Sequence, residues 1–139
     1  MAVDDAVVAR LNGQTIGGVA LATGTNLFRG PVRLNDVGLT PSPCVFVLAN
    51  GGNAPQPYLG QGEDMRYAGV TCSIRSAPDA FAAGQTLARG VWARLQRATL
   101  TTLSGATDCR CINSEPSYSG MDDDGFHEWT VQLEVLYRA

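Results

Sequence analysis

The four cysteines have the widest potential chemistry in this sequence, because thiolates bind metals and act as nucleophiles. Cys109 and Cys111 are separated by one residue, whereas Cys44 and Cys72 stand alone in other segments. Paired thiolate ligands usually stand about two to four residues apart, so this spacing does not predict a metal site. Each cysteine lies in a segment with strand character, and we interpret all four as small buried hydrophobic residues.

The single histidine, His127, follows an acidic run formed by Asp122, Asp123 and Asp124. These side chains suggest one hypothesis, a small hydrolase or metal-dependent enzyme. Calcium loops place their ligands at alternate positions, however, and the Asp-Gly dipeptide at 124–125 is a strong turn signal. A solvated hairpin turn beside a surface histidine is the favoured interpretation, and we predict no catalytic residue, no metal ligand and no cofactor.

The composition indicates one globular domain. The chain has 139 residues, of which 45% are hydrophobic and 17% are charged, and its net charge is -3. This length predicts a single domain over residues 1–139. All ten basic residues are arginine and none form a basic run, which argues against sequence-independent binding of nucleic acid. A secretory signal and a membrane-spanning segment are not evident, so we expect no membrane partner.

A strand followed by a long helix organises the middle of the chain. Apolar and polar residues alternate from Tyr67 to Arg75, which predicts a half-buried strand with Val70, Cys72 and Ile74 on its inner face. Ser76 is predicted to cap the amphipathic helix that follows. The helix has a basic face with Arg89, Arg94 and Arg97, and its apolar face consists of Ala80, Gly84, Leu87, Ala88, Val91, Leu95 and Ala98.

The remaining elements are shorter. The strand over 129–137 has the clearest alternation, and the segment over 44–49 is apolar on both faces, as is typical of a central strand. We also expect a helix over 6–11 capped by Asp4 or Asp5, extended residues at 26–28 and 32–34, a strand over 108–113, a long exposed loop over 50–63, a turn over 102–106 and an acidic turn over 119–125.

This order of elements predicts an α+β fold. Its sheet is expected to be mixed but mostly antiparallel, with four to five strands. One long helix and a short N-terminal helix are expected to pack against it.

Several short motifs occur in an order that resembles a known family. They are Gly24–Pro31, the strand Val45–Val47 that leads to Asn50-Gly51-Gly52, the junction Val70–Ser76, and Gly120-x-Asp122-x-x-Gly125 ahead of Trp129-x-Val131. Over nearly its full length, the chain resembles the tail terminator or minor capsid proteins of long-tailed bacteriophages.

The resemblance implies a structural role and no catalysis. Such subunits assemble into a homohexameric ring at the head-proximal end of the tail tube, where they terminate tube polymerisation and join the tail to the neck. The implied partners are the tail tube protein, a neck or stopper protein and the tape measure protein. Genomic DNA would pass through the lumen without specific binding. The implied location is the head-tail junction of the virion, after synthesis in the host cytoplasm.

Two loops are the predicted contact surfaces of this ring. Their candidate interface residues are Asn50, Gly51, Asn53, Tyr58 and Gln61 in the first loop, and Met121, Asp122, Asp123 and Asp124 in the second. Two alternatives remain open at this point. One is another head-tail connector, such as a stopper or head-completion protein, and the other is the small metal-dependent enzyme described above.

Overall fold

The structure, a computed structural model, describes residues 2–30, 43–57, 64–103 and 107–138. Two helices and nine strands occur in these residues, and no described helix is long and apolar enough to cross a membrane. In chain order the elements are α1 (Val3–Leu11), β1 (Thr15–Ile16), β2 (Val19–Ala20), β3 (Leu27–Arg29), β4 (Cys44–Ala49), β5 (Asn53–Pro57), β6 (Asp64–Ser76), α2 (Phe81–Leu95), β7 (Thr107–Cys111), β8 (Ser117–Met121) and β9 (His127–Arg138).

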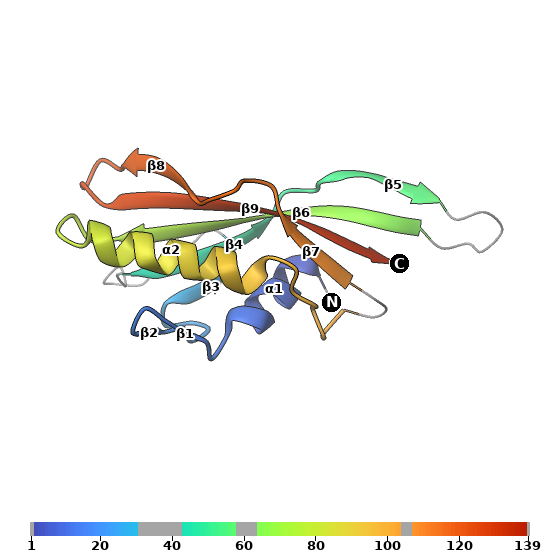
Figure 1. Ribbon diagram of the computed structural model, residues 1–139, viewed down its shortest axis with the longest axis horizontal. Helices are drawn as coiled ribbons and strands as arrows, with labels where there is room; N and C mark the ends of the chain where they lie inside the picture. Colours follow the sequence, from blue (N-terminus) through green and yellow to red (C-terminus); the bar gives the residue numbers. More distant parts are fainter. Residues whose placement is uncertain (1, 31–42, 58–63, 104–106, 139) are drawn as a thin grey trace.

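Two long antiparallel strands, β6 and β9, form the centre of the sheet. Their register runs from Met65 opposite Arg138 to Ser76 opposite His127 (Figure 1). Both strands are longer than the alternation in the sequence predicts, because polar residues at their ends continue the backbone ladder. This ribbon is the frame to which the shorter strands attach.

The shorter strands flank different halves of the ribbon. At one end the strand order is β3-β4-β6-β9-β8, and at the other end it is β5-β6-β9-β7. Only the β3–β4 pair is parallel within this sheet. The predicted α+β class with a mostly antiparallel mixed sheet is confirmed. The sheet has seven strands rather than four to five, because β5 and β8 lie in segments predicted as loops.

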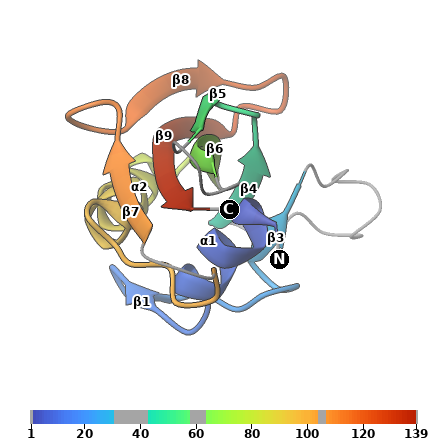
Figure 2. The same ribbon diagram turned by 90° about the vertical axis from the view of Figure 1, so that its right-hand side faces the viewer.

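Both helices pack on the same face of the sheet, and Figure 2, viewed down the long axis of the molecule, shows them beside each other. The predicted inner positions of α2 are buried, including Leu87, Val91 and Leu95. Gly84 marks the closest approach, because a Cβ atom there would overlap the Ser76 hydroxyl and the Trp129 ring. The other main core residues are Val7, Leu11, Leu27, Val45, Val47, Val70, Cys72, Ile74, Val131, Leu133 and Val135.

The predicted helix caps are wrong. Ser76 is the last residue of β6, and α2 begins after Ala80 without a side-chain cap. Ladder pairing with His127 keeps Ser76 in the strand. The first helix begins at Val3 rather than at residue 6, and Asp4 lies in its first turn, where its carboxylate pairs with Arg29 at 3.1 Å.

The end of α2 also differs from the prediction. The helix stops at Leu95, and Arg97 adopts a left-handed conformation with φ of 62°. The Arg97 N–H then donates to the Cys109 carbonyl of β7 at 2.8 Å. This hydrogen bond to β7 replaces the one that would continue the helix. Ala98 is buried as predicted, although it lies beyond the helix.

Two predicted irregular segments contain strands. Residues 53–57 form β5, where prolines are tolerated because the strand lies at an edge and contains a bulge. Residues 117–121 form β8, so the acidic turn is confined to Asp122–Phe126. The predicted extended segment at 32–34, and part of the predicted turn at 102–106, lie outside the described residues.

The expected burial of β4 on both faces is also wrong. Val45 and Val47 are fully buried, but Phe46 is half-buried and Leu48 is 46% exposed. No described helix covers this second face, since both helices pack on the side of Val45 and Val47. An apolar strip therefore remains on the outer face of the sheet.

Candidate assembly surface

The described parts of the two predicted contact loops lie apart along the β6–β9 ribbon: the turn at Asn50 lies beside Gly69, near the middle of β6, and the turn after Met121 lies where β9 begins. One hairpin joins β5 to the start of β6 at Asp64, and the other joins β8 to the start of β9 at His127. Because β6 and β9 are antiparallel, their first residues lie at opposite ends of the ribbon (Figure 1). The described residues of the two predicted surfaces are thus separated along the sheet.

The turn between β4 and β5 is held against β6 by Asn50. The Asn50 N–H donates to the Gly69 carbonyl at 2.9 Å, and the side-chain amide donates to the Thr71 hydroxyl at 2.9 Å. A Cβ atom on Gly69 would overlap the Asn50 side chain, so glycine permits this crossing. The turn is exposed, yet its position is defined.

The other predicted residues of this loop differ in their placement. Gly51 is exposed in a positive-φ turn, with φ of 88°, and Asn53 begins β5 opposite Tyr67. Tyr58 and Gln61 lie outside the described residues. The sequence therefore identified a surface turn but did not reveal the strand within it.

Asp122 organises the turn between β8 and β9. Its Oδ1 atom accepts hydrogen bonds from the N–H groups of Asp124 and Phe126, both at 2.9 Å. Its Oδ2 atom accepts from Arg75, with distances of 3.0 Å to Nε and 2.6 Å to Nη2. The carboxylate thus closes its own turn and attaches that turn to β6.

Arg75 is the buried half of this ion pair. Its side chain is 4% exposed, against 24% for Asp122, and its guanidinium lies 3.8 Å from the centre of the Phe126 ring. Burial raises the pKa of the Asp122 carboxyl, but hydrogen bonds from Arg75 and the turn amides, with the Arg75 charge, lower it below its usual value overall. Asp122 is therefore a structural carboxylate. The sequence placed Arg75 only on the polar side of its strand.

Three neighbours of Asp122 project into solvent. Met121 is 66% exposed at the end of β8, and Asp123 and Asp124 are exposed in the turn. No ion pair links either of these aspartates to another described residue. Their side chains can contact another molecule without breaking a bond within the subunit.

His127 is buried, which corrects the prediction of a surface histidine. Its Nε2 atom lies 3.0 Å from the Pro78 carbonyl, and its Nδ1 atom lies 2.9 Å from the Tyr118 hydroxyl. A carbonyl only accepts, so Nε2 donates to Pro78, and Nδ1 forms the second hydrogen bond, with the Tyr118 hydroxyl. Both ring nitrogens are engaged and Asp122 is held by Arg75. His127 and Asp122 are thus both used in contacts within the subunit.

An aromatic cluster surrounds His127, and the sequence analysis missed it. Phe81 from α2 lies 5.2 Å from Trp129 and 5.3 Å from Tyr118, measured between ring centres. Phe81 and Tyr118 are 41% and 46% exposed, respectively. Large exposed rings that contact one another are typical of interaction surfaces. Their separation in the sequence hid this grouping.

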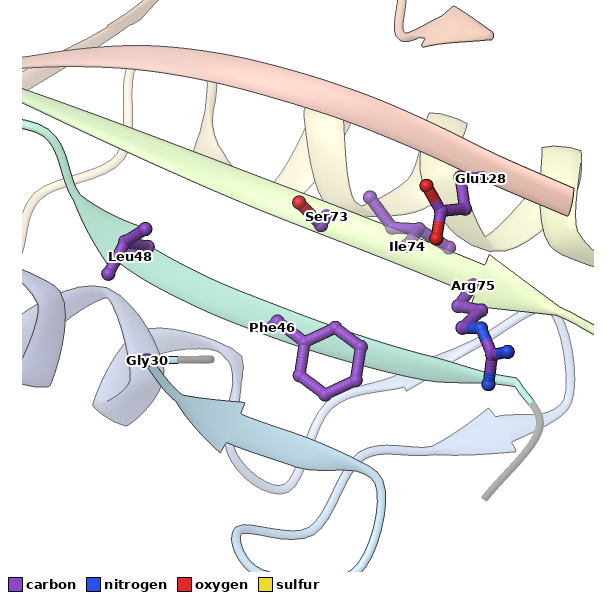
Figure 3. Close-up of a pocket in the computed structure, with 7 residues that line it drawn as sticks. All are labelled: Gly30, Phe46, Leu48, Ser73, Ile74, Arg75 and Glu128. Carbon is purple, nitrogen blue, oxygen red and sulfur yellow. The ribbon is translucent and has the colours of Figure 1, made fainter. Parts of the chain in front are cut away.

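A hollow of about 260 Å³ lies on the outer face of the sheet. Figure 3 shows the side chains of Phe46 and Leu48 on β4, with Arg75 of β6 and Glu128 of β9 at the end of the hollow nearer Phe46. The Phe46 ring stacks on Phe28 of β3, with 5.6 Å between ring centres. This apolar hollow with two charged side chains suits contact with another protein surface.

The cysteines are placed as buried hydrophobic residues. Burial raises the pKa of the Cys72 thiol to about 12 and that of Cys44 to about 11. Burial raises the pKa of Cys109 to about 12 and that of Cys111 to about 11. Among the described residues, no three histidine, cysteine or acidic side chains cluster as metal ligands would.

Comparisons with known proteins connect this fold to a virus-like particle. The sequence matches no protein-family model and no curated protein sequence. The structure is similar to a chain in the solved structure described as "Virion of native gene transfer agent (GTA) particle", with a TM-score of 0.69 and 14% identity. The match covers 99% of this chain and 96% of that chain.

The comparison first defines a fold class, an α+β fold that is shared over 99% of this chain and 96% of the matched chain. More particularly, the fold is shared with a component of the gene transfer agent virion. At this identity the likeness establishes the fold, and function is a separate inference.

Proposed function

We propose that this protein is a virion structural subunit of a phage-like particle, and that it acts as the tail terminator. The full-length fold likeness to a chain of the gene transfer agent virion is the observation that carries this proposal. The resemblance of the sequence motifs to tail terminators of long-tailed phages supports the more specific role. The subunit functions by assembly and carries out no reaction.

The proposed assembly is a homohexameric ring at the head-proximal end of the tail tube. A ring needs two different surfaces on each subunit, so that one copy contacts the next in a head-to-tail manner. The outer hollow beside Leu48 is one such surface with apolar content. The ring terminates tube polymerisation and joins the tail to the neck.

The two hairpin ends then face different partners. We assign Asn50, Gly51, Asn53, Tyr58 and Gln61 to one partner surface, and Met121, Asp123 and Asp124 to the other, with Asp122 positioning the second. The partners are the tube protein, a neck or stopper protein and the tape measure protein. In support, the turn at Asn50 lies beside Gly69 near the middle of β6, whereas Met121 lies opposite His127 at the start of β9, so the described residues of the two groups are separated along the sheet.

Genomic DNA passes through the lumen of the proposed ring without specific binding. Retention of DNA would require many cations against phosphates, and this chain carries a net charge of -3. The arginines Arg75, Arg29 and Arg110 are already paired with carboxylates of the same subunit.

Electron microscopy of the purified protein tests the proposal, together with its mass in solution by light scattering. A hollow ring, formed either alone or on isolated tail tubes, is the expected result. A protein that stays monomeric and never caps tubes would defeat the proposal. Cross-linking in particles distinguishes a terminator from another head-tail connector, because a stopper or head-completion protein would cross-link to the portal side rather than to the tube.

A further inference from the structure

Four strands of the main sheet have a single strand neighbour among the described residues: β3, β5, β7 and β8. The outer edge of such a strand presents unpaired N–H and C=O groups, which can pair with another chain. Proteins usually protect these edges with prolines, charges or covering segments. The four edges of this sheet are not protected equally.

Two edges are protected locally. In β3, the Leu27 N–H donates to the Ala22 carbonyl at 3.3 Å, and the Leu27 carbonyl accepts from Gly24 at 2.9 Å. The outward groups of Leu27 are therefore used by the turn before the strand. In β5, Pro55 and Pro57 lack N–H groups, which removes two donors from that edge.

The edge of β7 is covered by the residues that follow α2. The Cys109 carbonyl accepts from the Arg97 N–H at 2.8 Å, and the Cys111 N–H donates to the Gln96 side-chain carbonyl at 2.7 Å. The left-handed conformation of Arg97 turns the chain into this position. An incoming strand would have to displace this segment.

The edge of β8 has no such cover among the described residues. The Asp122 N–H donates to the Phe126 carbonyl, so the backbone groups of the preceding residue, Met121, turn outward. A bulge between Tyr118 and Gly120 interrupts the ladder, and beyond it the backbone groups of Tyr118, opposite Trp129, also turn outward. Residues 117–121 contain no charged residue and no proline. This edge has the properties of a strand that accepts a partner.

A small hollow lies beside this edge, on the helix side of the sheet. It has a volume of about 110 Å³ and is lined by Phe81, Tyr118 and Trp129, with Arg89 and Glu115 also contributing. The side chains of a strand alternate between faces, so a strand added to β8 would point every second side chain toward α2. An apolar side chain of moderate size fits this position.

We propose that β8 binds an extended segment of a different polypeptide, which adds a strand to the sheet. Backbone hydrogen bonds to Tyr118 and Met121 hold the segment, and an apolar side chain enters the hollow beside Phe81. A basic residue at one end of the segment lies next to Asp123 and Asp124, which have no ion-pair partner among the described residues.

The partner is a different chain rather than a second copy. Pairing of β8 with itself is twofold and would join subunits in pairs, whereas a closed ring repeats one head-to-tail contact. The described edges of β3, β5 and β7 are protected, so none of them offers a ready strand to a neighbouring β8. The choice of a different chain rests on the proposed ring. It makes the β8 edge a surface that binds a partner protein at one end of the ring.

Peptide binding to the full-length protein tests the inference. The probe is a short fluorescent peptide in which valine and threonine alternate between two terminal lysines. Its controls are the same peptide with terminal glutamates and with a central proline. We expect binding of the lysine-ended peptide, with about tenfold weaker binding after either change. Hydrogen exchange is expected to slow at the Tyr118 and Met121 amides on binding.

Two matched variants locate the contact. Met121→Lys places a charge on the β8 edge and is expected to weaken peptide binding by about tenfold. Ile112→Lys makes the same kind of change at another residue that is 59% exposed, and it is expected to leave binding unchanged. Equal effects of the two variants, or peptide binding without protection of the two amides, would overturn the inference.

The outcomes separate this inference from the ring proposal. If the protein forms rings but the peptide does not slow hydrogen exchange at the Tyr118 and Met121 amides, the inference is defeated and the ring proposal is left intact. Peptide binding at β8 by a protein that never forms rings would defeat the ring alone. Protection of the two amides by self-association, without peptide, would assign the edge to a second copy and overturn the inference.

Discussion

Arg75 and Asp122 are joined across 47 residues of sequence by two hydrogen bonds to a single carboxylate oxygen, at 3.0 and 2.6 Å. Arg75 lies near the end of β6, and Asp122 begins the turn between β8 and β9. This contact fixes the exposed Asp123 and Asp124 relative to the sheet. The position of a proposed contact surface therefore depends on one buried cation.

Removal of the Asp122 carboxylate is expected to destabilise the fold. Asp122→Ala leaves Arg75 buried without its partner and removes the acceptor of two turn amides, which costs about 2–4 kcal/mol of unfolding free energy. Urea denaturation measures this loss. Asp123→Ala, at an exposed neighbour, is expected to change stability by less than about 0.5 kcal/mol. Equal losses for both variants would show that the ion pair contributes nothing specific.

The same pair predicts a dependence of stability on acid. The pKa of Asp122 is lowered in the folded protein, so its contribution is complete above the ordinary value near about 4. That contribution is lost as the pH falls through the lower folded pKa. Denaturation midpoints are measured from neutral to acidic pH. They are expected to fall less steeply with pH in the Asp122→Asn variant than in the unaltered protein. An identical slope in both proteins would refute the assignment.

Gly84→Ala is expected to destabilise the protein although alanine favours helices. Its Cβ atom would overlap the Ser76 hydroxyl and the Trp129 ring, and separation of α2 from the sheet costs about 1–3 kcal/mol. Ala83→Gly, at the preceding exposed position, is expected to cost about 1 kcal/mol from helix propensity alone. Thermal unfolding of both variants separates packing from propensity. A gain in stability from Gly84→Ala would contradict the close contact.

The cysteines are expected to resist thiol reagents in the folded protein. Burial raises the pKa of Cys72 and Cys109 to about 12, so neither thiol is ionised near pH 8. Ellman's reagent is expected to react slowly with the native protein and rapidly after unfolding in guanidinium. Ser119→Cys, which adds an exposed thiol on β8, is the positive control. Fast reaction of the unaltered native protein would show that a cysteine is accessible.

The periodic segments were predictable because their signal is local. Alternation over residues 67–75 and 129–137 identified the two central strands, and three- and four-residue spacing identified α2 with Leu87, Val91 and Leu95 inside. Burial on one face requires that spacing, whatever lies opposite. The ends of these elements were less predictable, because the conformations of Ser76 and Arg97 are set by hydrogen bonding to the neighbouring strands β9 and β7.

The candidate surface was only partly predictable. Asp-Gly at 124–125 marked the turn; Asp123 is exposed in it, and Met121 is exposed at the end of β8. The sequence pattern did not indicate that Asp122 turns inward to Arg75 or that His127 is buried against Tyr118. Proline-rich and glycine-rich segments also concealed β5 and β8, because an edge strand needs little burial and tolerates such residues.

The sequence by itself determined the α+β class, the two long strands, the main helix and the buried role of the cysteines. Each follows from the periodicity or chemistry of neighbouring residues. Only the tertiary structure decided which strand edge stays open, which aspartate is held by Arg75 and which aromatic rings meet around His127. Those properties depend on pairs of residues far apart in the chain, which strand register and helix packing bring together.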